Sequence, residues 1–340
     1  MPEPPKNQAW LDLSPETALE PELPIIDPHH HLWDGNPARL QPRYLLDEIL
    51  ADTNAGHNIV STVFIECSSM YKADGPEHMK PVGEVEFVNG IAAMSASGGF
   101  GETRVAAGII GTAPLRMGDA VQEVLDASIA AGGGRYRGIR VACARDDEPL
   151  APVHRTSPPA HLYEMPDFRE GFKHLAPRNL SFEVWCYHPQ IPDATSLARA
   201  FPDTTIVLNH FGGPIGVGRY AGKGDEVFAQ WRGYIDELSQ CPNVVAKLGG
   251  IAMEVNGFAW QDNPKPPTSD ELMQATRRYY EYTIERFTPQ RCMFESNFPV
   301  DKVSASYSTV WNSFKRLTQG YSASDRAALF HDTAKRVYRL

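Results

Sequence analysis

Cysteine, basic charge and long apolar runs are all scarce in this sequence, and each shortage excludes a class of protein. The five cysteines are odd in number and far apart, which argues against a disulfide-stapled domain and indicates reduced residues. Lys and Arg total 32 against 42 Asp and Glu, so the net charge of −10 argues against a nucleic-acid surface but leaves room for a local basic pocket. No apolar run reaches the ~18 residues that a membrane-spanning helix needs.

The N-terminus also lacks a basic segment followed by an apolar one, so no secretory signal is expected and the location predicted is cytoplasmic. Residues 1–23 are rich in Pro and Glu and predict an extended arm, laid on the surface or on a partner subunit. The chain of 340 residues, 42% of them apolar, is long enough for one large domain or two ordinary ones. We expect a single domain over residues 24–340.

Short apolar runs alternate with helical stretches from Pro24 onward. Most of the runs are continuously apolar, as in parallel strands that are buried on both faces. The eight candidate strands are Ile25–Asp27, Ile59–Glu66, Arg104–Gly111, Tyr136–Val141, Ser181–Tyr187, Thr204–Asn209, Asn243–Leu248 and Arg291–Glu295. Helices are expected over Gly83–Ser95, Met117–Ala131, Pro166–Leu175, Ala194–Ala200, Phe228–Leu238, Ser269–Arg286, Ser304–Leu317 and Ser324–Val337.

Four returns from helix to strand share one pattern, in which the helix ends, a Pro follows and the strand begins: LAPRNLSFEVW, RAFPDTTIVLN, SQCPNVVAKLG and RFTPQRCMFES. Pro ends a helix because it cannot continue the hydrogen-bond ladder. These returns are short, whereas the exits from strands are long. Short returns and long exits predict a (β/α)8 barrel (TIM barrel) with its site at the C-terminal face. An open doubly wound sheet would alternate in the same way, but no GxGxxG follows the first strand.

Three consecutive histidines, His29, His30 and His31, end the first candidate strand. Because side chains of a strand alternate between its faces, His29 and His31 point the same way and His30 points the other. An H-x-H pair at the barrel mouth can chelate one divalent cation through two imidazoles. The alternative is that these histidines only bond to the backbone and cap the barrel.

A further histidine, His210, ends the sixth candidate strand within NHFGGP. The glycines and the proline after it predict a tight turn that exposes the imidazole. His210 is a candidate metal ligand, general base or donor to a carbonyl oxygen. A loop histidine with a structural hydrogen bond is the alternative.

Together with GIR (138–140), KLGG (247–250) and RCMFESNFP (291–299), the segments IDPHHHLWD and NHFGGP resemble the amidohydrolase-2 branch of the amidohydrolase superfamily in order and position. The chain is most similar to its lactonase-like group, which includes pyrone-dicarboxylate lactonase and sugar-acid lactonases. The resemblance covers Pro24 to about Leu317. It implies a (β/α)8 barrel of the metal-dependent-hydrolase type, with decarboxylases in a sister group, and places His29, His31 and His210 in the site.

The sequence departs from this resemblance at the eighth strand. The family motif G-S/T-D-x-P carries an Asp that shuttles protons, and Asn297 stands at that position here. An amide accepts no proton near neutral pH. Glu295 lies two residues earlier, on the same side of the strand, and is our preferred replacement, although a buried structural ion pair is equally compatible with it. Asp301 is the second candidate, and a solvated loop pair with Lys302 is its alternative.

The loss of that Asp leaves the ligand set of a metal open. Catalytic zinc commonly takes three protein ligands and a water. His188 at the fifth strand, where related decarboxylases place a ligand, and Glu183 within that strand are candidates beside His29 and His31. We expect one divalent ion, zinc first. Metal-free catalysis also stays open, because some lactonases of the group hold the substrate with histidines and arginines alone.

Substrate contacts are expected from strand ends and long loops. Arg140 could clamp a carboxylate bidentately, and Lys247 ends the seventh strand; a structural ion pair is the alternative for each. Glu66 ends the second strand and is a weaker site candidate, for which an ion pair near the rim is the alternative. Residues in or beside the long loops are further candidates for substrate contact, and a packing or surface role is the alternative for each. They are Tyr71, Arg145, His154, Tyr187 and Trp260.

Three functional hypotheses follow from these residues. The first is a hydrolase that opens a cyclic ester, or a related small cyclic or carboxylated substrate, with activated water. The second is a metal-dependent non-oxidative decarboxylase of an aromatic or enoic acid. The third is a barrel without catalysis, which only Asn297 supports. A small-molecule substrate is expected in each catalytic case, neither nucleic acid nor membrane is an expected partner, and the Pro-rich arm is compatible with a homodimer.

Overall fold

The computed structural model describes residues 6–35, 40–148, 150 and 157–340. Eight strands form one sheet in the order β1 to β8, and every neighbouring pair is parallel. Pairing between His30 and Phe298, with His31 N–H donating to the Phe298 carbonyl at 2.8 Å, joins the two edges. The predicted (β/α)8 barrel is confirmed. Its strands are Pro24–His30, Asn58–Ile65, Arg104–Gly111, Tyr136–Ala142, Ser181–Trp185, Ile206–Leu208, Val244–Leu248 and Cys292–Phe294.

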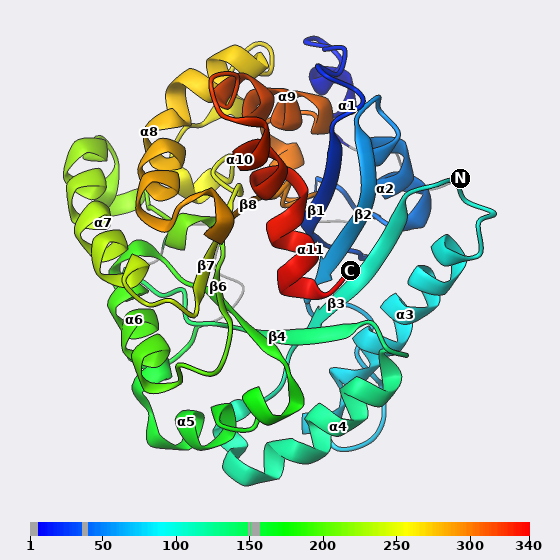
Figure 1. The fold of residues 1–340 in the computed structure, drawn as a ribbon, viewed down its shortest axis with the longest axis vertical. Coiled ribbons are helices and arrows are strands. Elements are labelled where there is room, and N and C mark those ends of the chain that lie inside the picture. The colour runs from blue at the N-terminus through cyan, green and yellow to red at the C-terminus, as the bar shows by residue number, and fades with distance from the viewer. Residues whose placement is uncertain (1–5, 36–39, 149, 151–156) are drawn as a thin grey trace.

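Helices surround the sheet (Figure 1). One of them, α2, was absent from the prediction; it has only eight residues, and its apolar face consists of Leu46 and Ile49. The structure confirms the Pro pattern, because each of the four short returns leads into its strand. The α-helices of the described residues are α1 Gln8–Leu11, α2 Leu46–Thr53, α3 Val82–Ala96, α4 Gln122–Ala131, α5 Pro166–Phe172, α6 Ile191–Ala200, α7 Gly224–Ser239, α8 Ser269–Phe287, α9 Tyr307–Leu317, α10 Ala323–Ala327 and α11 Thr333–Tyr338.

The described part of the N-terminal arm lies against its own chain. Trp10 Nε1 donates to the Asn263 carbonyl at 2.9 Å, and Glu16 accepts from the Ser269 amide at 2.6 Å. The buried Lys315 of α9 donates to the carbonyl of Leu19 at 2.6 Å. These contacts fasten the arm across α8 and α9.

The C-terminal helix α11 lies in front of the barrel strands in Figure 1 (red). Its residues Ala334, Val337 and Tyr338 pack against side chains that point into the barrel from six strands. The apolar floor formed in this way separates the N-terminal end of the barrel from the polar centre above it. The inward-pointing strand residues of this floor are Ile26, Val63, Ile65, Ile110, Val207, Val245 and Met293.

No helix of the described residues is both long enough and apolar enough to span a bilayer.

Candidate active site

His29 and His31 meet inside the barrel, as the alternation of the strand predicts. Their Nε2 atoms lie 3.3 Å apart, whereas His30 turns the other way and packs edge-on against Phe64. His31 Nδ1 lies 2.8 Å from the Ile65 carbonyl oxygen, which can only accept, so Nδ1 carries the proton. The Nε2 atom of neutral His31 therefore offers a lone pair toward His29.

Glu295 lies between two imidazoles. Its Oε2 is 2.6 Å from His29 Nδ1 and its Oε1 is 2.7 Å from His210 Nδ1. The His210 amide also faces Oε1, at 3.3 Å. The contact to His210 is a hydrogen bond, which places a proton on His210 Nδ1 and leaves Nε2 as its basic nitrogen. The contact to His29 is short but lacks hydrogen-bond geometry, and neither His29 Nδ1 nor Glu295 Oε2 has a hydrogen-bond partner among the described residues. The carboxylate thus orients the His210 ring through Oε1, while Oε2 lies against the His29 ring.

Two glycines of KLGG make room for this arrangement. A Cβ atom on Gly250, whose φ is +67°, would lie 2.1 Å from His210 Nδ1. A Cβ atom on Gly249 would lie 2.1 Å from the Glu295 carbonyl oxygen. Both positions thus require glycine. The sequence motif singled out KLGG, but its contact with His210 depends on the fold.

The HFGG turn aims His210 into the barrel. His210 and Phe211 both have positive φ, 53° and 59°, which is uncommon for residues other than glycine. Strain of this kind persists where the surrounding structure enforces it, and it is concentrated at functional sites. Trp185 packs edge-on against the His210 ring at 4.9 Å between centroids and helps to fix it.

Arg140 connects the cluster to the rim of the barrel. Its Nε donates to Glu66 Oε1 at 2.8 Å and its Nη2 to the Glu66 carbonyl at 2.6 Å, which leaves Nη1 3.4 Å from His29 Nε2. Exposure rises from 0% for the Glu295 side chain through 5% for Arg140 and 13% for Glu66 to 36% for Tyr71. Exposure at this end of the barrel thus increases from the cluster toward Glu66 and Tyr71.

The electrostatics of the cluster keep His29 neutral. Burial lowers its pKa well below the ordinary value, and the positive charges of Lys247 and Arg140 add to this, as do the neighbouring histidines. A neutral imidazole is the form that can bind a cation or accept a proton through its unprotonated ring nitrogen.

Asn297 pairs with the other candidate acid. Its Nδ2 donates to Asp301 Oδ1 at 2.8 Å, and the Ala252 amide donates to Oδ2 at 3.2 Å. Burial raises the pKa of Asp301 to about 8. The predicted alternative of a solvated Asp301–Lys302 pair is wrong, because Asp301 is buried and Lys302 binds Asp52 at 2.9 Å.

Glu183 and Lys247 bind each other beneath the cluster. Lys247 Nζ lies 2.8 and 3.0 Å from the two Glu183 oxygens, and both side chains are fully buried. The Glu183 carboxylate is thus occupied, which is a correction to its prediction as a metal ligand. Lys247 is likewise the structural ion pair that the sequence left open, because its ammonium is already taken by Glu183 away from any solvent.

His188 does not join the other histidines. It begins the turn after β5, and its ring packs edge-on against Tyr220. Its Nδ1 accepts a hydrogen bond from the Ile215 amide at 3.4 Å. Burial lowers its pKa to about 4. Its prediction as a metal ligand is corrected here, because the backbone turns before residue 188 and carries the ring outward.

The remaining predicted substrate contacts lie at the rim or in loops. Tyr71 is exposed at the rim, and partial desolvation together with the charges of Glu84 and Glu66 raises the pKa of its hydroxyl. Tyr187 is buried against Trp185, and Trp260 stacks on Phe258 at 6.0 Å. His154 lies outside the described residues.

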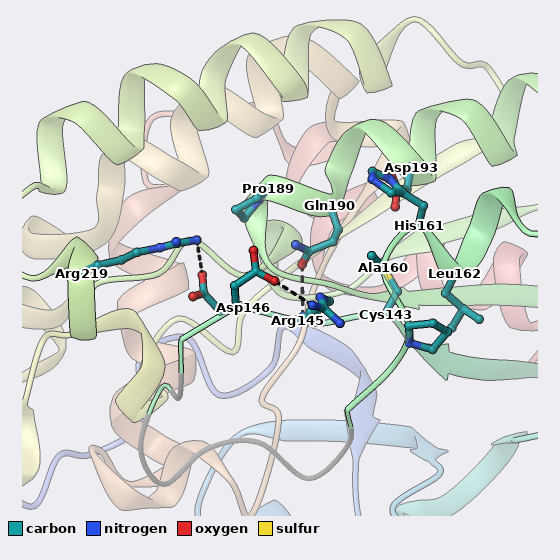
Figure 2. A pocket seen from close by; sticks show the side chains of 12 residues that line it. Cys143, Arg145, Asp146, Ala160, His161, Leu162, Pro189, Gln190, Asp193 and Arg219 are labelled. Carbon is teal, nitrogen blue, oxygen red and sulfur yellow. Dashed lines mark hydrogen bonds and ion pairs between the residues drawn. The ribbon is translucent and has the colours of Figure 1, made fainter.

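Cavities lined by described residues lie on the loops around this centre, and two of them are well defined. The first, of about 200 Å³, lies beyond β4 and β5 and is shown in Figure 2, where Arg145 binds Asp147 and Arg219 binds Asp146. The second, of about 170 Å³, lies between Tyr220 and Tyr279. Neither is lined by a histidine of the buried cluster, so Arg145, a predicted substrate contact, belongs to a separate hollow.

The buried cluster has the donors of a divalent-metal site. His29, His210 and Glu295 each place a ligand atom within 4.8 Å of the others. The 3.3 Å between the Nε2 atoms of His29 and His31 matches two ligands of a tetrahedral ion with bonds of about 2.0–2.1 Å. The Nδ1 atoms of His31 and His210, which are hydrogen-bonded to the Ile65 carbonyl and to Glu295, match the support that metal-binding histidines receive from carbonyl and carboxylate oxygens. These residues fit zinc.

Comparisons with known proteins agree with the barrel. The family model described as Amidohydrolase (Amidohydro_2) matches residues 26–340. The chain is 34% identical to the Sinorhizobium fredii protein y4mH over 337 residues, 94% of this chain and 99% of that protein. It is 30% identical to an L-fucono-1,5-lactonase of Burkholderia multivorans over 175 residues, 51% of this chain and 56% of the lactonase.

Solved structures share the fold. A crystal structure of an amidohydrolase from Burkholderia multivorans with bound zinc matches 93% of this chain and 99% of its own length, with a TM-score of 0.69 and 24% identity. A match of the family model over residues 26–340 and a relative aligned over nearly its whole length determine the family. The chain is therefore a member of the amidohydrolase family and an enzyme of the amidohydrolase type.

Proposed function

We propose that this enzyme hydrolyses a lactone, with His210 as the general base and Glu295 as the carboxylate that orients it. The observation that carries the proposal is the position of Glu295, whose oxygens lie 2.6 and 2.7 Å from the Nδ1 atoms of His29 and His210. This arrangement revises the expectation that Glu295 itself takes the proton from water. Nε2 of His210 is the nitrogen left to accept it.

In the proposed reaction, His210 first accepts a proton from water and later donates it to the leaving oxygen. Water forms a bond to the lactone carbonyl carbon while His210 Nε2 takes its proton, and Glu295 stabilises the imidazolium that forms. Arg140 Nη1, the nitrogen that Glu66 does not occupy, donates to the developing oxyanion. The ring C–O bond then breaks, and the proton passes from His210 to the leaving oxygen, which gives a hydroxy acid.

A divalent ion, zinc first, would be held by His29 and His31 through their facing Nε2 atoms. When bound, it would polarise the lactone carbonyl and so support the role of Arg140. Arg140 Nη1 already lies 3.4 Å from His29 Nε2, and its positive charge weakens binding of a cation there. The proposed mechanism therefore depends on His210, Glu295 and Arg140.

Paired charges favour an uncharged lactone over a carboxylated one. Among the described residues of the barrel centre, Arg140 is neutralised by Glu66 and Lys247 by Glu183. A substrate carboxylate would meet a single guanidinium nitrogen, whereas bidentate recognition needs two. Similarity to an L-fucono-1,5-lactonase over half of this chain supports a sugar lactone.

A panel of lactones tests the proposal. Purified protein is incubated with aldono-1,4- and 1,5-lactones and with a dicarboxylated pyrone, and acid release is followed with a pH indicator. We expect ring opening of uncharged lactones that His210→Asn abolishes while the thermal midpoint stays near that of the wild type. Release of CO₂ from aromatic or enoic acids, without any ring opening, would refute the proposal in favour of the decarboxylase.

A further inference from the structure

The C-terminal helix inserts a hydroxyl group into the polar centre of the barrel. Tyr338, the last residue of α11, is fully buried among the side chains of the apolar floor. Its hydroxyl donates to Glu183 Oε1 at 2.5 Å. A residue two positions from the end of the chain thus contacts the ion pair beneath the catalytic cluster, and packing alone would be served equally well by Phe.

Glu183 is surrounded by donors from separate parts of the chain. Lys247 contacts both of its oxygens, Asn209 Nδ2 donates to Oε2 at 2.7 Å and Tyr338 donates to Oε1. A carboxylate offers about four lone-pair positions, so these contacts fill them. The Lys247 ammonium also lies 5.3 Å from the centre of the Tyr338 ring, which adds a cation–π contact.

The ion pair lies one layer below Glu295. Lys247 pairs in register with Met293, and Glu295 follows Met293 by two residues on the same face of β8. Burial lowers the pKa of Lys247, while the charges of Glu183 and Glu295 oppose the shift. Lys247 is thus attracted by two carboxylates, one in the ion pair and one in the catalytic cluster.

We propose that Tyr338 is a positioning residue for the catalytic cluster: together with Glu183 and Asn209 it holds Lys247 in the lower layer, so that both Glu295 oxygens stay with the imidazoles. If the lower carboxylate loses a donor, the geometry of the pair relaxes and Lys247 moves relative to Glu295. A shifted ammonium competes with the Nδ1–H group of His210 for Oε1 and displaces Oε2 from its contact with His29. This inference rests on the proposed function only for its effect on turnover.

The experiment compares Tyr338→Phe with a matched control. The control is Tyr44→Phe, because Tyr44 is equally buried and its hydroxyl donates at 2.7 Å to Asp52, which binds Lys302. Both variants lose one carboxylate-bound hydroxyl and keep the ring. Long-range ¹H–¹⁵N spectra of histidine-labelled protein report the hydrogen bonding of each imidazole, with assignments from His29→Ala and His210→Ala.

We expect Tyr338→Phe to shift the ring resonances of His29 and His210 and Tyr44→Phe to leave them in place. If Tyr338→Phe does not fold, Glu183→Gln replaces it, because this substitution keeps the shape of the side chain. The same shifts of the His29 and His210 resonances are then expected. Unchanged resonances in a folded variant of this pair would overturn the proposal. With a lactone substrate, kcat of Tyr338→Phe should fall on the order of tenfold or more at constant KM. Shifted resonances in a protein that opens no lactone would reject the proposed function and leave the positioning role standing.

Discussion

Replacing Glu295 by Gln should nearly abolish turnover while leaving a folded barrel. The substitution exchanges one carboxylate oxygen for an NH₂ group, which donates and cannot accept. If the NH₂ group takes the place of Oε1, the Nδ1–H group of His210, at 2.7 Å, faces a donor. That ring must either keep an unsatisfied buried N–H or move its proton to Nε2, the nitrogen that the mechanism needs free.

The expected magnitudes follow from these contacts. A hydrogen bond to a charged group contributes about 1.5–3 kcal/mol to stability, and removing the buried carboxylate offsets part of its loss. We therefore expect the free energy of unfolding to fall by about 1–2 kcal/mol. Exchange of an orienting carboxylate for its amide lowers kcat on the order of 10⁴-fold in serine proteases, because the imidazole takes the wrong tautomer. A similar loss is expected here.

The assay combines lactone hydrolysis with urea unfolding of Glu295→Gln and of Asp301→Asn. Asp301 is the control because it is a buried carboxylate near the same strand end that is hydrogen-bonded to Asn297. We expect Asp301→Asn to retain most of the activity. Full activity of Glu295→Gln beside an inactive Asp301→Asn would refute the reasoning and transfer the proton chemistry to Asp301.

Three further predictions concern metal, the oxyanion and pH. Elemental analysis should find a divalent ion that is lost in His29→Ala and His31→Ala but retained in His210→Ala; loss in the last would make His210 a ligand and contradict its role as base. Arg140→Lys should lower kcat on the order of 10²-fold, since Lys cannot span Glu66 and the oxyanion together, and an unchanged kcat would remove Arg140 from the mechanism. His188, with a folded pKa of about 4 against about 6.5 when unfolded, should make the free energy of unfolding decrease by up to about 1.4 kcal/mol per unit as pH falls through that window. Urea unfolding of His188→Asn should show a shallower pH dependence, and an identical slope would contradict the assignment.

The fold could be predicted because its signals are local. Continuous apolar runs and a Pro before four of the strands depend only on near neighbours in the chain, and every predicted strand overlaps an observed one. Position at a strand end also has a local origin. It was enough to bring together His29, His31 and Glu295, which lie at the ends of β1 and β8, the two edges that close the barrel.

Partner choice inside the barrel could not be predicted, because it depends on register between strands. Glu183 is polar and points inward, and the sequence allows a metal or a cation as its partner; only the alignment of β5 with β7 brings Lys247 to it. His188 fails as a ligand because the chain turns after Trp185. Tyr338 carries no motif at all, and its role appears only when α11 packs against the floor.

The Asn at position 297 changes the route of the proton and keeps the barrel suited to hydrolysis. An Asp there could face water directly, but Asn297 cannot, and its amide binds Asp301 instead. Glu295 supplies the missing negative charge from behind His29 and His210, so the basic group that remains to face the substrate is an imidazole nitrogen. Such a site needs a fixed carboxylate more than an exposed one. The buried charges below, Lys247 with Glu183 and Tyr338, have the geometry to keep it fixed.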